Sequence, residues 1–235
     1  MRHNINYRLY ERVRKRGYQP AHVAEVGVWH PDTSNLYQYI QDGVRTTLVE
    51  PDPRAVQLIR EQFGGKSNVT LHDVAICDFN GEVDLFKRES STFVSLLKSS
   101  PTVVNDDFDI QKGERFRAKA RLFSDIDDGT IDLLTVDTEG SEWFVIKHMR
   151  SRPTVVSIET HGGMYVNPYL EELLGWMREN NYLLWYKEKS DSVFVLRDTI
   201  AVSFLDRARL LLSEVAIGFR SKKKRLKKAI RELYR

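Results

Sequence analysis

One stretch, residues 22–50, decides the fold, and it reads HVAEVGVWHPDTSNLYQYIQDGVRTTLVE. Two short apolar runs, Val23–Val28 and Val44–Val49, flank a segment with helical periodicity, Ser34–Gln41. The pattern predicts a strand, a turn, a helix and a second strand, which is the unit from which parallel sheets are built. We therefore expect an α/β protein whose other elements extend this sheet.

Two acids and a glycine mark the ends of these two predicted strands. Glu25 and Gly27 form an acid–x–Gly turn in the first run, and Glu50 directly follows the second. Parallel sheets bind ligands at the carboxyl ends of their strands, so Glu50 suits a bidentate hydrogen bond to the two hydroxyls of a ribose. The glycine lets the backbone approach the ligand, and the helix start offers free N–H groups.

The composition is that of a soluble globular protein. The 235 residues are 41% hydrophobic and 29% charged, enough for one α/β domain with a sizeable core. The single cysteine, Cys77, excludes an intrachain disulfide and a cysteine-based zinc site. Neither a signal peptide nor an apolar run of about 18 residues is apparent, so we expect a cytoplasmic protein without a spanning helix.

Charge is distributed unevenly along the chain. Eight basic residues and one acid fall in the last fifteen positions, 221–235, whereas the net charge of the whole chain is only +3. The remainder is therefore mildly acidic. We expect a main domain over residues 1–198 and a basic helical extension over 199–235.

Further apolar segments complete the predicted sheet. Strands are expected at Asn68–Val74, Ile131–Val136, Thr154–Ile158, Tyr182–Tyr186 and Val193–Leu196, and helices at 5–16, 55–63, 141–149 and 167–179. Asn80-Gly81 predicts a hairpin within Ile76–Phe86. The segment Ser90–Arg121 is expected to be a variable connection with one short helix at Thr92–Leu97. The last two strands are too close in sequence to be parallel, so one strand should run antiparallel.

The segments EVGVWHP, LVEPDP, LHDVAI, VDTEGSEW and SIETHG, in this order and spacing, resemble the FkbM family of S-adenosylmethionine-dependent methyltransferases. The resemblance covers residues 20–197. It implies a Rossmann-like class I methyltransferase fold, with a seven-stranded, mostly parallel sheet and an antiparallel last strand. It also implies methyl transfer to oxygen, so we expect an O-methyltransferase acting on a hydroxyl of a sugar or glycan, lipid-linked glycans and polysaccharides included.

The resemblance also assigns site residues. The positions that match the family's donor-binding residues are Glu25, Gly27, Glu50, Asp73 and Val74. The turn departs from the family pattern, because Glu25 replaces an aspartate and Pro31 replaces a second glycine. Val28, Trp29 and His30 are bulky for a loop beside a cofactor, and Trp29 is equally suited to contact an acceptor or to fill the core. The alternative function is therefore a catalytically inactive protein that keeps the fold and docks to a membrane or partner.

Methylation of an alcohol requires that its proton be removed. His161 is the first candidate base because its intrinsic pKa is near neutral, and Asp137, which matches the acid after the fourth strand, is the second. Asp137 and Glu159 end adjacent strands and could hold Mg²⁺, with Glu139 helping to position the acceptor. The Asp–Asn pair usual in metal-dependent enzymes is missing, so a metal-free mechanism is favoured.

The basic tail, Lys222–Arg235, alternates lysine and arginine with apolar residues. A basic amphipathic helix of this kind binds anionic bilayers, which would place the enzyme at the inner face of the membrane. Helix packing or an oligomer contact is the second interpretation. Nucleic-acid binding is the third, and the lack of an RNA-binding motif counts against it.

Overall fold

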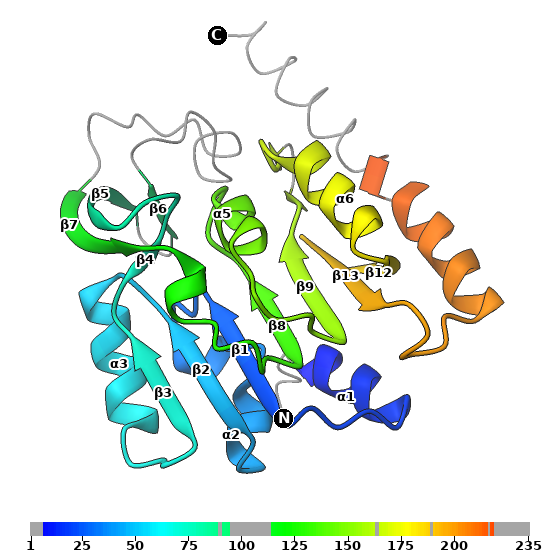
Figure 1. Cartoon of the computed structure of the whole chain (residues 1–235), viewed down its shortest axis with the longest axis horizontal. Helices are drawn as coiled ribbons and strands as arrows, with labels where there is room; N and C mark the ends of the chain where they lie inside the picture. Colours follow the sequence, from blue (N-terminus) through cyan, green and yellow to red (C-terminus); the bar gives the residue numbers. More distant parts are fainter. Residues whose placement is uncertain are drawn as a thin grey trace, which may run out of the picture.

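The computed structural model describes residues 7–88, 91–94, 114–162, 165–188, 190–215 and 217–218. Its centre is a seven-stranded sheet with the order β12-β13-β9-β8-β1-β2-β3, which runs across Figure 1. The strands are β1 (His22–Val26), β2 (Arg45–Val49), β3 (Val69–His72), β8 (Leu133–Val136), β9 (Val155–Glu159), β12 (Tyr182–Glu188) and β13 (Asp191–Leu196).

The direction of each strand confirms the predicted topology. β1 runs parallel to β2 and to β8, β3 continues the parallel order beyond β2, and β9 continues it beyond β8. β13 lies between β9 and β12 and is antiparallel to both. After β1 the chain adds strands on one side, β2 and β3, and later strands, from β8 on, are added on the other side of β1. Such a reversal of the strand order opens a crevice at the carboxyl ends of the strands.

Helices cover both faces of this sheet. One face carries α1 (Tyr7–Lys15), α2 (Tyr37–Gln41) and α3 (Pro53–Phe63), whose apolar residues pack with Val23 and Leu133. The other face carries α5 (Glu142–Lys147) and α6 (Leu170–Glu179), which pack with Ala24 and Leu134. Neighbouring residues of one strand thus enter opposite cores, which is why β1 and β8 are apolar almost throughout.

A second, four-stranded sheet has the order β4-β7-β5-β6 and corrects the hairpin predicted at Asn80-Gly81. β4 (Ala75–Ile76) and β5 (Gly81–Arg88) do not pair; they lie on opposite sides of β7 (Glu114–Arg121). The Asn80 side chain accepts from the Leu122 N–H (2.9 Å) and donates to Asp125 (2.9 Å). Asn80 therefore fastens its segment to the chain after β7 instead of building a two-residue turn.

The helix expected at Thr92–Leu97 is also wrong over its described part. Residues Ser91–Val94 form β6, which pairs antiparallel with β5, so that Phe93 lies opposite Phe86. β-branched and aromatic residues favour such an edge strand over an isolated helical turn. The rest of that expected helix lies outside the described residues.

Residues 204–215 are helical, in agreement with a helix after the last strand. The tail Lys222–Arg235 lies outside the described residues, and the division at residue 198 stays a prediction. Two short 3-10 turns, η1 (Pro31–Thr33) and η3 (Phe123–Asp125), and the small ribbon β10 (His161–Gly162) with β11 (Tyr165–Val166) complete the described elements. Within the described chain, every helix is too short or too polar to cross a bilayer.

Candidate functional site

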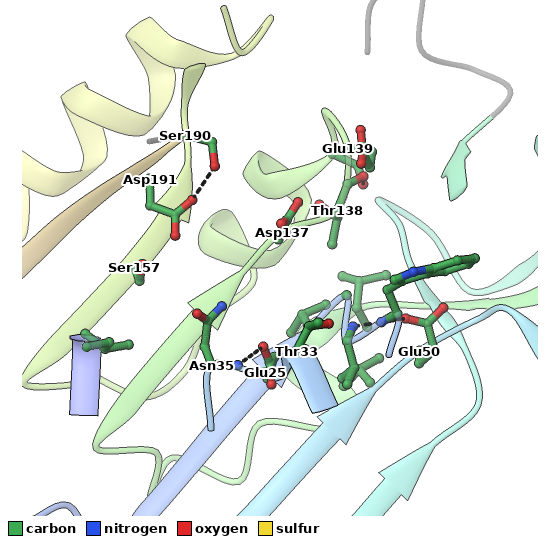
Figure 2. A pocket seen from close by; sticks show the side chains of 18 of the residues that line it. Glu25, Thr33, Asn35, Glu50, Asp137, Thr138, Glu139, Ser157, Ser190 and Asp191 are labelled. Carbon is green, nitrogen blue, oxygen red and sulfur yellow. Dashed lines mark hydrogen bonds between the residues drawn. The ribbon is translucent and has the colours of Figure 1, made fainter. Parts of the chain in front are cut away.

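A cavity of about 330 Å³ opens at the carboxyl ends of β1, β2 and β8, where the order of the strands reverses. Figure 2 shows that acidic side chains from several elements face this space: Glu25, Glu50, Asp137, Glu139 and Asp191. Its size lies in the range of small-molecule sites, and its place in the fold is the expected one for a ligand.

Gly27 forms the floor of the cavity. Its backbone has φ +85°, a left-handed conformation that L side chains rarely adopt, and its N–H donates to the Val49 carbonyl (2.9 Å). A Cβ at this position would lie 1.7 Å from the Asp137 carbonyl oxygen. A glycine is therefore required here because the ends of β1 and β8 pack closely against each other. This close packing also places Gly27 on the cavity wall.

Glu50 lines the cavity and also builds the loop beside it. One carboxylate oxygen accepts the N–H groups of Val28 (3.0 Å) and Trp29 (2.8 Å), and the other accepts that of Asp52 (2.9 Å). An ionised carboxylate offers about four lone-pair sites, so one remains for a ligand hydroxyl. Burial raises the pKa of Glu50, and the three backbone donors lower it. The bulky loop Val28–Trp29 is thus held open by Glu50 and does not close the cavity.

Trp29 lies on the cavity wall with its backbone at φ 55°. This conformation is costly for a non-glycine residue and is usually retained where the surroundings enforce it. From the sequence, Trp29 was equally suited to contact an acceptor or to fill the core. Its side chain is half-buried at the site, so it does not fill the core.

Glu25 organises the turn that follows β1. The Ser34 hydroxyl donates to one carboxylate oxygen, and the Asn35 N–H donates to the other (2.9 Å). The side chain is buried on the cavity wall, and burial raises its pKa to about 7, whereas the hydrogen bonds from Ser34 and Asn35 act in the opposite direction. Glu25 therefore positions Asn35, whose side chain also faces the cavity (Figure 2).

The far end of the cavity is apolar. Val74, Ala75, Ile76 and Leu85 line it, so the second sheet contributes a wall through β4 and β5. Asp73, predicted for this end, does not line the cavity; its exposed carboxylate pairs with Arg60 at 3.0 Å on the surface. Val74 lies on the cavity wall, and its role in donor binding stays a prediction.

The loop after β8 is shaped by a buried carboxylate. Glu142 Oε1 accepts the N–H groups of Thr138 (2.8 Å) and Gly140 (3.1 Å), and Oε2 accepts from the Asn167 side chain. Asn167 also donates to the Glu159 carbonyl (3.3 Å) and so links the ends of β8 and β9. Glu139 has φ 56° within this loop, and its side chain faces the cavity (Figure 2).

Three carboxylates converge behind that loop. Single oxygens of Asp137, Glu142 and Glu159 lie within 4.8 Å of one another. Asp137 is exposed on the side that faces the cavity and has protein on its other sides, whereas Glu142 and Glu159 are buried. Burial raises the pKa of Asp137 well above its usual value, the charges of Glu139, Asp191 and Glu142 raise it further, and a hydrogen bond with Glu159 lowers it. Burial followed by the charge of Asp137 has the same raising effect on Glu159.

His161 is placed differently from the other predicted residues. Its Nδ1 contacts the Thr160 hydroxyl (2.9 Å), its backbone N–H donates to the Ser190 carbonyl (3.1 Å), and the residue does not line the cavity. Burial and the Lys187 charge lower its pKa to about 4. Its role as a base stays a prediction, but the imidazole is not brought together with Asp137 on the cavity wall.

Several wall residues escaped the sequence analysis: Arg8, Asn35, Ser157, Glu188, Ser190 and Asp191. Arg8 of α1 pairs with Glu188 at the end of β12, and Ser190 donates to Asp191 (3.0 Å). Arg8, Glu188 and Asp191 come from the first helix and the last two strands, and Ser190 lies directly before β13. Only the antiparallel insertion of β13 places Ser190 and Asp191 at the site.

Comparisons with known proteins identify a protein family. The sequence matches the profile of the methyltransferase FkbM domain over residues 21–184. No curated protein matches the chain significantly. The methyltransferase domain of bacterial CtHen1 aligns with 81% of this chain and 97% of its own, at 9% identity and a TM-score of 0.47.

Other solved structures align to a similar extent. The methyltransferase PaMTH1 of Podospora anserina, bound to S-adenosylhomocysteine, covers 82% of this chain and 78% of its own, at 11% identity and a TM-score of 0.42. The glycopeptide N-methyltransferase MtfA covers 80% and 88%, at 7% identity and a TM-score of 0.42. The profile match runs from β1 into β12 and includes four of the acids on the cavity wall, Glu25, Glu50, Asp137 and Glu139. The chain belongs to the FkbM methyltransferase family.

Proposed function

We propose that this protein is an S-adenosylmethionine-dependent O-methyltransferase whose acceptor is a hydroxyl group of a sugar or glycan. Membership of the FkbM family supports methyl transfer, and the cavity at the sheet reversal supports a nucleoside-containing donor. The observation that carries the proposal is the place of Asp137, whose carboxylate reaches the cavity directly beside the Gly27 turn.

The residues present fit the donor along the length of the cavity. The apolar wall of Val74, Ile76 and Leu85 suits an adenine ring, and Glu50 has one lone-pair site left for a ribose hydroxyl. Acidic side chains at the other end suit the positive charges of the donor's methionine portion. When bound, S-adenosylmethionine supplies an electrophilic methyl group on its sulfonium.

Asp137 is the favoured base among the residues predicted from sequence. A base must reach the proton that it removes, and Asp137 lies on the cavity wall whereas His161 does not. Asp137 would accept the O–H proton of the acceptor as the acceptor oxygen takes the methyl group from the sulfonium, which would become a neutral thioether.

The charges on the cavity wall indicate which class of acceptor can bind. Six carboxylates line its described wall and one guanidinium, that of Arg8, accompanies them. Hydroxyl groups donate well to carboxylates, whereas phosphate or carboxylate groups on an acceptor would be repelled. An uncharged polyol such as a neutral sugar is therefore the acceptor class that the wall suits.

The first experiment is calorimetric titration with S-adenosylhomocysteine of the wild type, of Glu50→Gln and of the control Asp73→Asn. We expect the wild type and Asp73→Asn to bind with similar affinity. Glu50→Gln should bind more than tenfold more weakly, because an amide nitrogen replaces an acceptor at the ribose position. Equal binding by all three would contradict the donor site.

The second experiment separates an enzyme from an inactive protein. Neutral glycan fractions are incubated with S-adenosylmethionine carrying a labelled methyl group, and the label is followed into base-stable ether linkages. Donor binding without transfer to any fraction would favour the scaffold alternative. Label that is recovered in amines would instead overturn the assignment of oxygen as the acceptor atom.

A further inference from the structure

We propose that Asp137, Glu142 and Glu159 form a binding site for a hard divalent cation such as Mg²⁺ or Mn²⁺. Each residue offers one carboxylate oxygen, and the three oxygens lie within 4.8 Å of one another. Opposite oxygens around a bound cation are about 4.2 Å apart for Mg²⁺ and about 4.8 Å apart for Ca²⁺, given the usual metal–oxygen distances. The three ligands therefore fit one coordination sphere with little movement.

The ligand set is built into rigid structure. Glu142 is held by two backbone N–H groups of its own loop and by the Asn167 side chain. Asn167 also holds the Glu159 carbonyl, so the ends of β8 and β9 keep their spacing. Outer partners of this kind fix the orientation of metal ligands.

A buried phenol gives a second, independent indication of a ligand. Tyr165 is only 1% exposed, yet its hydroxyl has no hydrogen-bond partner among the residues that the structure describes. The phenol lies near the same cluster, since the charges of Glu142, Glu159, Glu139 and Asp137, after burial itself, raise the pKa of Tyr165. Buried polar groups are normally satisfied, and an oxygen ligand carried by a cation would accept from this phenol.

The negative charge of the cluster and its oxygen ligands indicate which kind of cation it would bind. Glu142 and Glu159 are buried, Asp137 is exposed beside them at the cavity, and Glu139 and Asp191 add to the negative charge there. Buried like charges are costly unless a counter-charge compensates them. Carboxylate oxygens without imidazole or thiolate are the donors preferred by Mg²⁺, Mn²⁺ and Ca²⁺, and not by Zn²⁺.

The site adjoins the reaction space through Asp137, which belongs to both the cluster and the cavity wall. A cation there would draw an acceptor oxygen toward it and lower the pKa of the acceptor hydroxyl. This use of the cation rests on the proposed function, whereas its binding does not.

The test is calorimetric titration of chelator-treated, dialysed protein with Mn²⁺, Mg²⁺ and Ca²⁺, together with thermal unfolding in the presence and absence of each ion. We expect at least one of these ions to bind the wild type with one-to-one stoichiometry and to raise its Tm. Glu159→Gln should bind more than tenfold more weakly and lose that rise in Tm. Asp73→Asn removes an exposed carboxylate outside the cluster and should behave as the wild type.

Loss of folding is distinguished from loss of a ligand. Without metal, Glu159→Gln should unfold at the same temperature as the wild type or higher, because the amide relieves repulsion with Asp137. Absence of binding by all three ions to a wild type that binds S-adenosylhomocysteine would overturn the site, as would equal binding by Glu159→Gln. Ion binding without methyl transfer to any acceptor would support the cation site and contradict the proposed function.

A second inference concerns the helix of residues 204–215. Its large apolar side chains are exposed in a single stripe: Phe204 83%, Leu205 64%, Leu211 65%, Leu212 70% and Val215 57%. At about 100° per residue these five positions occupy one third of the helix circumference. The opposite face is attached to the domain through Asp206, which pairs with Arg16 and accepts from the Ser203 N–H (2.8 Å).

We infer that this stripe docks on an anionic lipid surface. The stripe presents enough apolar surface to enter the boundary between headgroups and acyl chains. The sequence that follows, residues 221–235, carries eight basic residues and one acid, and basic residues near an anionic bilayer strengthen binding to it. An apolar stripe followed in the sequence by a strongly basic segment suits an anionic bilayer, whereas binding to nucleic acid would not require the apolar stripe.

Co-sedimentation with vesicles tests this surface. The full chain should sediment with phosphatidylcholine–phosphatidylglycerol vesicles and less with phosphatidylcholine alone. The double variant Leu211→Ser/Leu212→Ser should reduce the bound fraction at least tenfold, whereas the control Leu58→Ser, at an exposed site on α3, should not. Unchanged sedimentation of the double variant, or a concentration-dependent dimer that this variant abolishes in the absence of lipid, would overturn the inference.

Discussion

Gly27 and Asp137 are in such close contact that a single methyl group on Gly27 would fall 1.7 Å from the Asp137 carbonyl oxygen. The Asp137 N–H in turn donates to the Val26 carbonyl (2.9 Å). The turn that we propose binds the donor and the acid that we propose faces the acceptor are therefore held together by backbone contacts. A change at Gly27 should consequently affect folding, donor binding and catalysis together.

Gly27→Ala should destabilise the protein by about 2–5 kcal/mol, since left-handed strain and overpacking against backbone add together. Urea denaturation measures the free energy of unfolding. Gly43→Ala is the matched control, because Gly43 has φ +81° but nothing within 4 Å of its added Cβ. That variant should lose only the strain, about 1–2 kcal/mol. Equal losses would show that the contact with Asp137 is unimportant.

Asn167→Asp should destabilise the fold by about 3 kcal/mol, although the two side chains have the same shape. The new carboxylate cannot donate to Glu142 and is repelled by it in a buried region. Denaturation at neutral and at acid pH provides the measurement, and acid should restore part of the loss. Asn180→Asp, which alters a half-buried asparagine at the end of α6, is the control and should cost less.

The sequence predicted the central sheet because its strands are buried on both faces and therefore apolar almost throughout. The acids at the strand ends could be predicted for the same reason, since Glu25, Glu50 and Asp137 interrupt those apolar runs. Asp73 also follows an apolar strand, but its side chain turns to Arg60 on the surface. The position of an acid in the chain predicts which edge of the sheet it reaches, and not the direction of its side chain.

The second sheet was not predictable in the same way. Asn80-Gly81 is a strong local turn pattern, and the contact that overrides it comes from Leu122 and Asp125, more than forty residues away. The roles of Glu142 and Asn167 also depend on long-range contacts. Glu142 is typical of a first helical turn, and only the folded chain shows it holding the loop after β8.

Stability should decrease as pH rises between about 4.5 and 7 because of Glu25. Burial raises its pKa to about 7 in the folded state, so in this range the folded protein holds a proton that the unfolded chain releases. Unfolding is thus favoured at the higher pH, by up to about 3 kcal/mol at neutrality relative to acid. The stabilisation is complete below the ordinary pKa of glutamate and is lost above pH 7.

Urea denaturation across this range, with a chelator present, measures the effect. Glu25→Gln should flatten the slope of unfolding free energy against pH by the contribution of one group, although it also loses a hydrogen bond at Ser34 or Asn35. Glu50 and Glu142 have raised pKa values as well, so a residual slope of the same sign is expected in the variant. Identical slopes for the two proteins would show that Glu25 is ionised throughout.

Asp137→Asn should lower turnover by about 10²–10⁴-fold while binding of S-adenosylhomocysteine stays within a few-fold of the wild type. His161→Asn should have a much smaller effect on turnover, because the imidazole does not line the cavity and its pKa is lowered to about 4. Single-turnover rates with a labelled methyl donor measure the chemical step, and calorimetry measures donor affinity. A large loss of turnover in His161→Asn with an intact fold would return the role of base to the histidine. Equal loss of turnover and donor binding in Asp137→Asn would show that this carboxylate holds the donor instead of removing the proton.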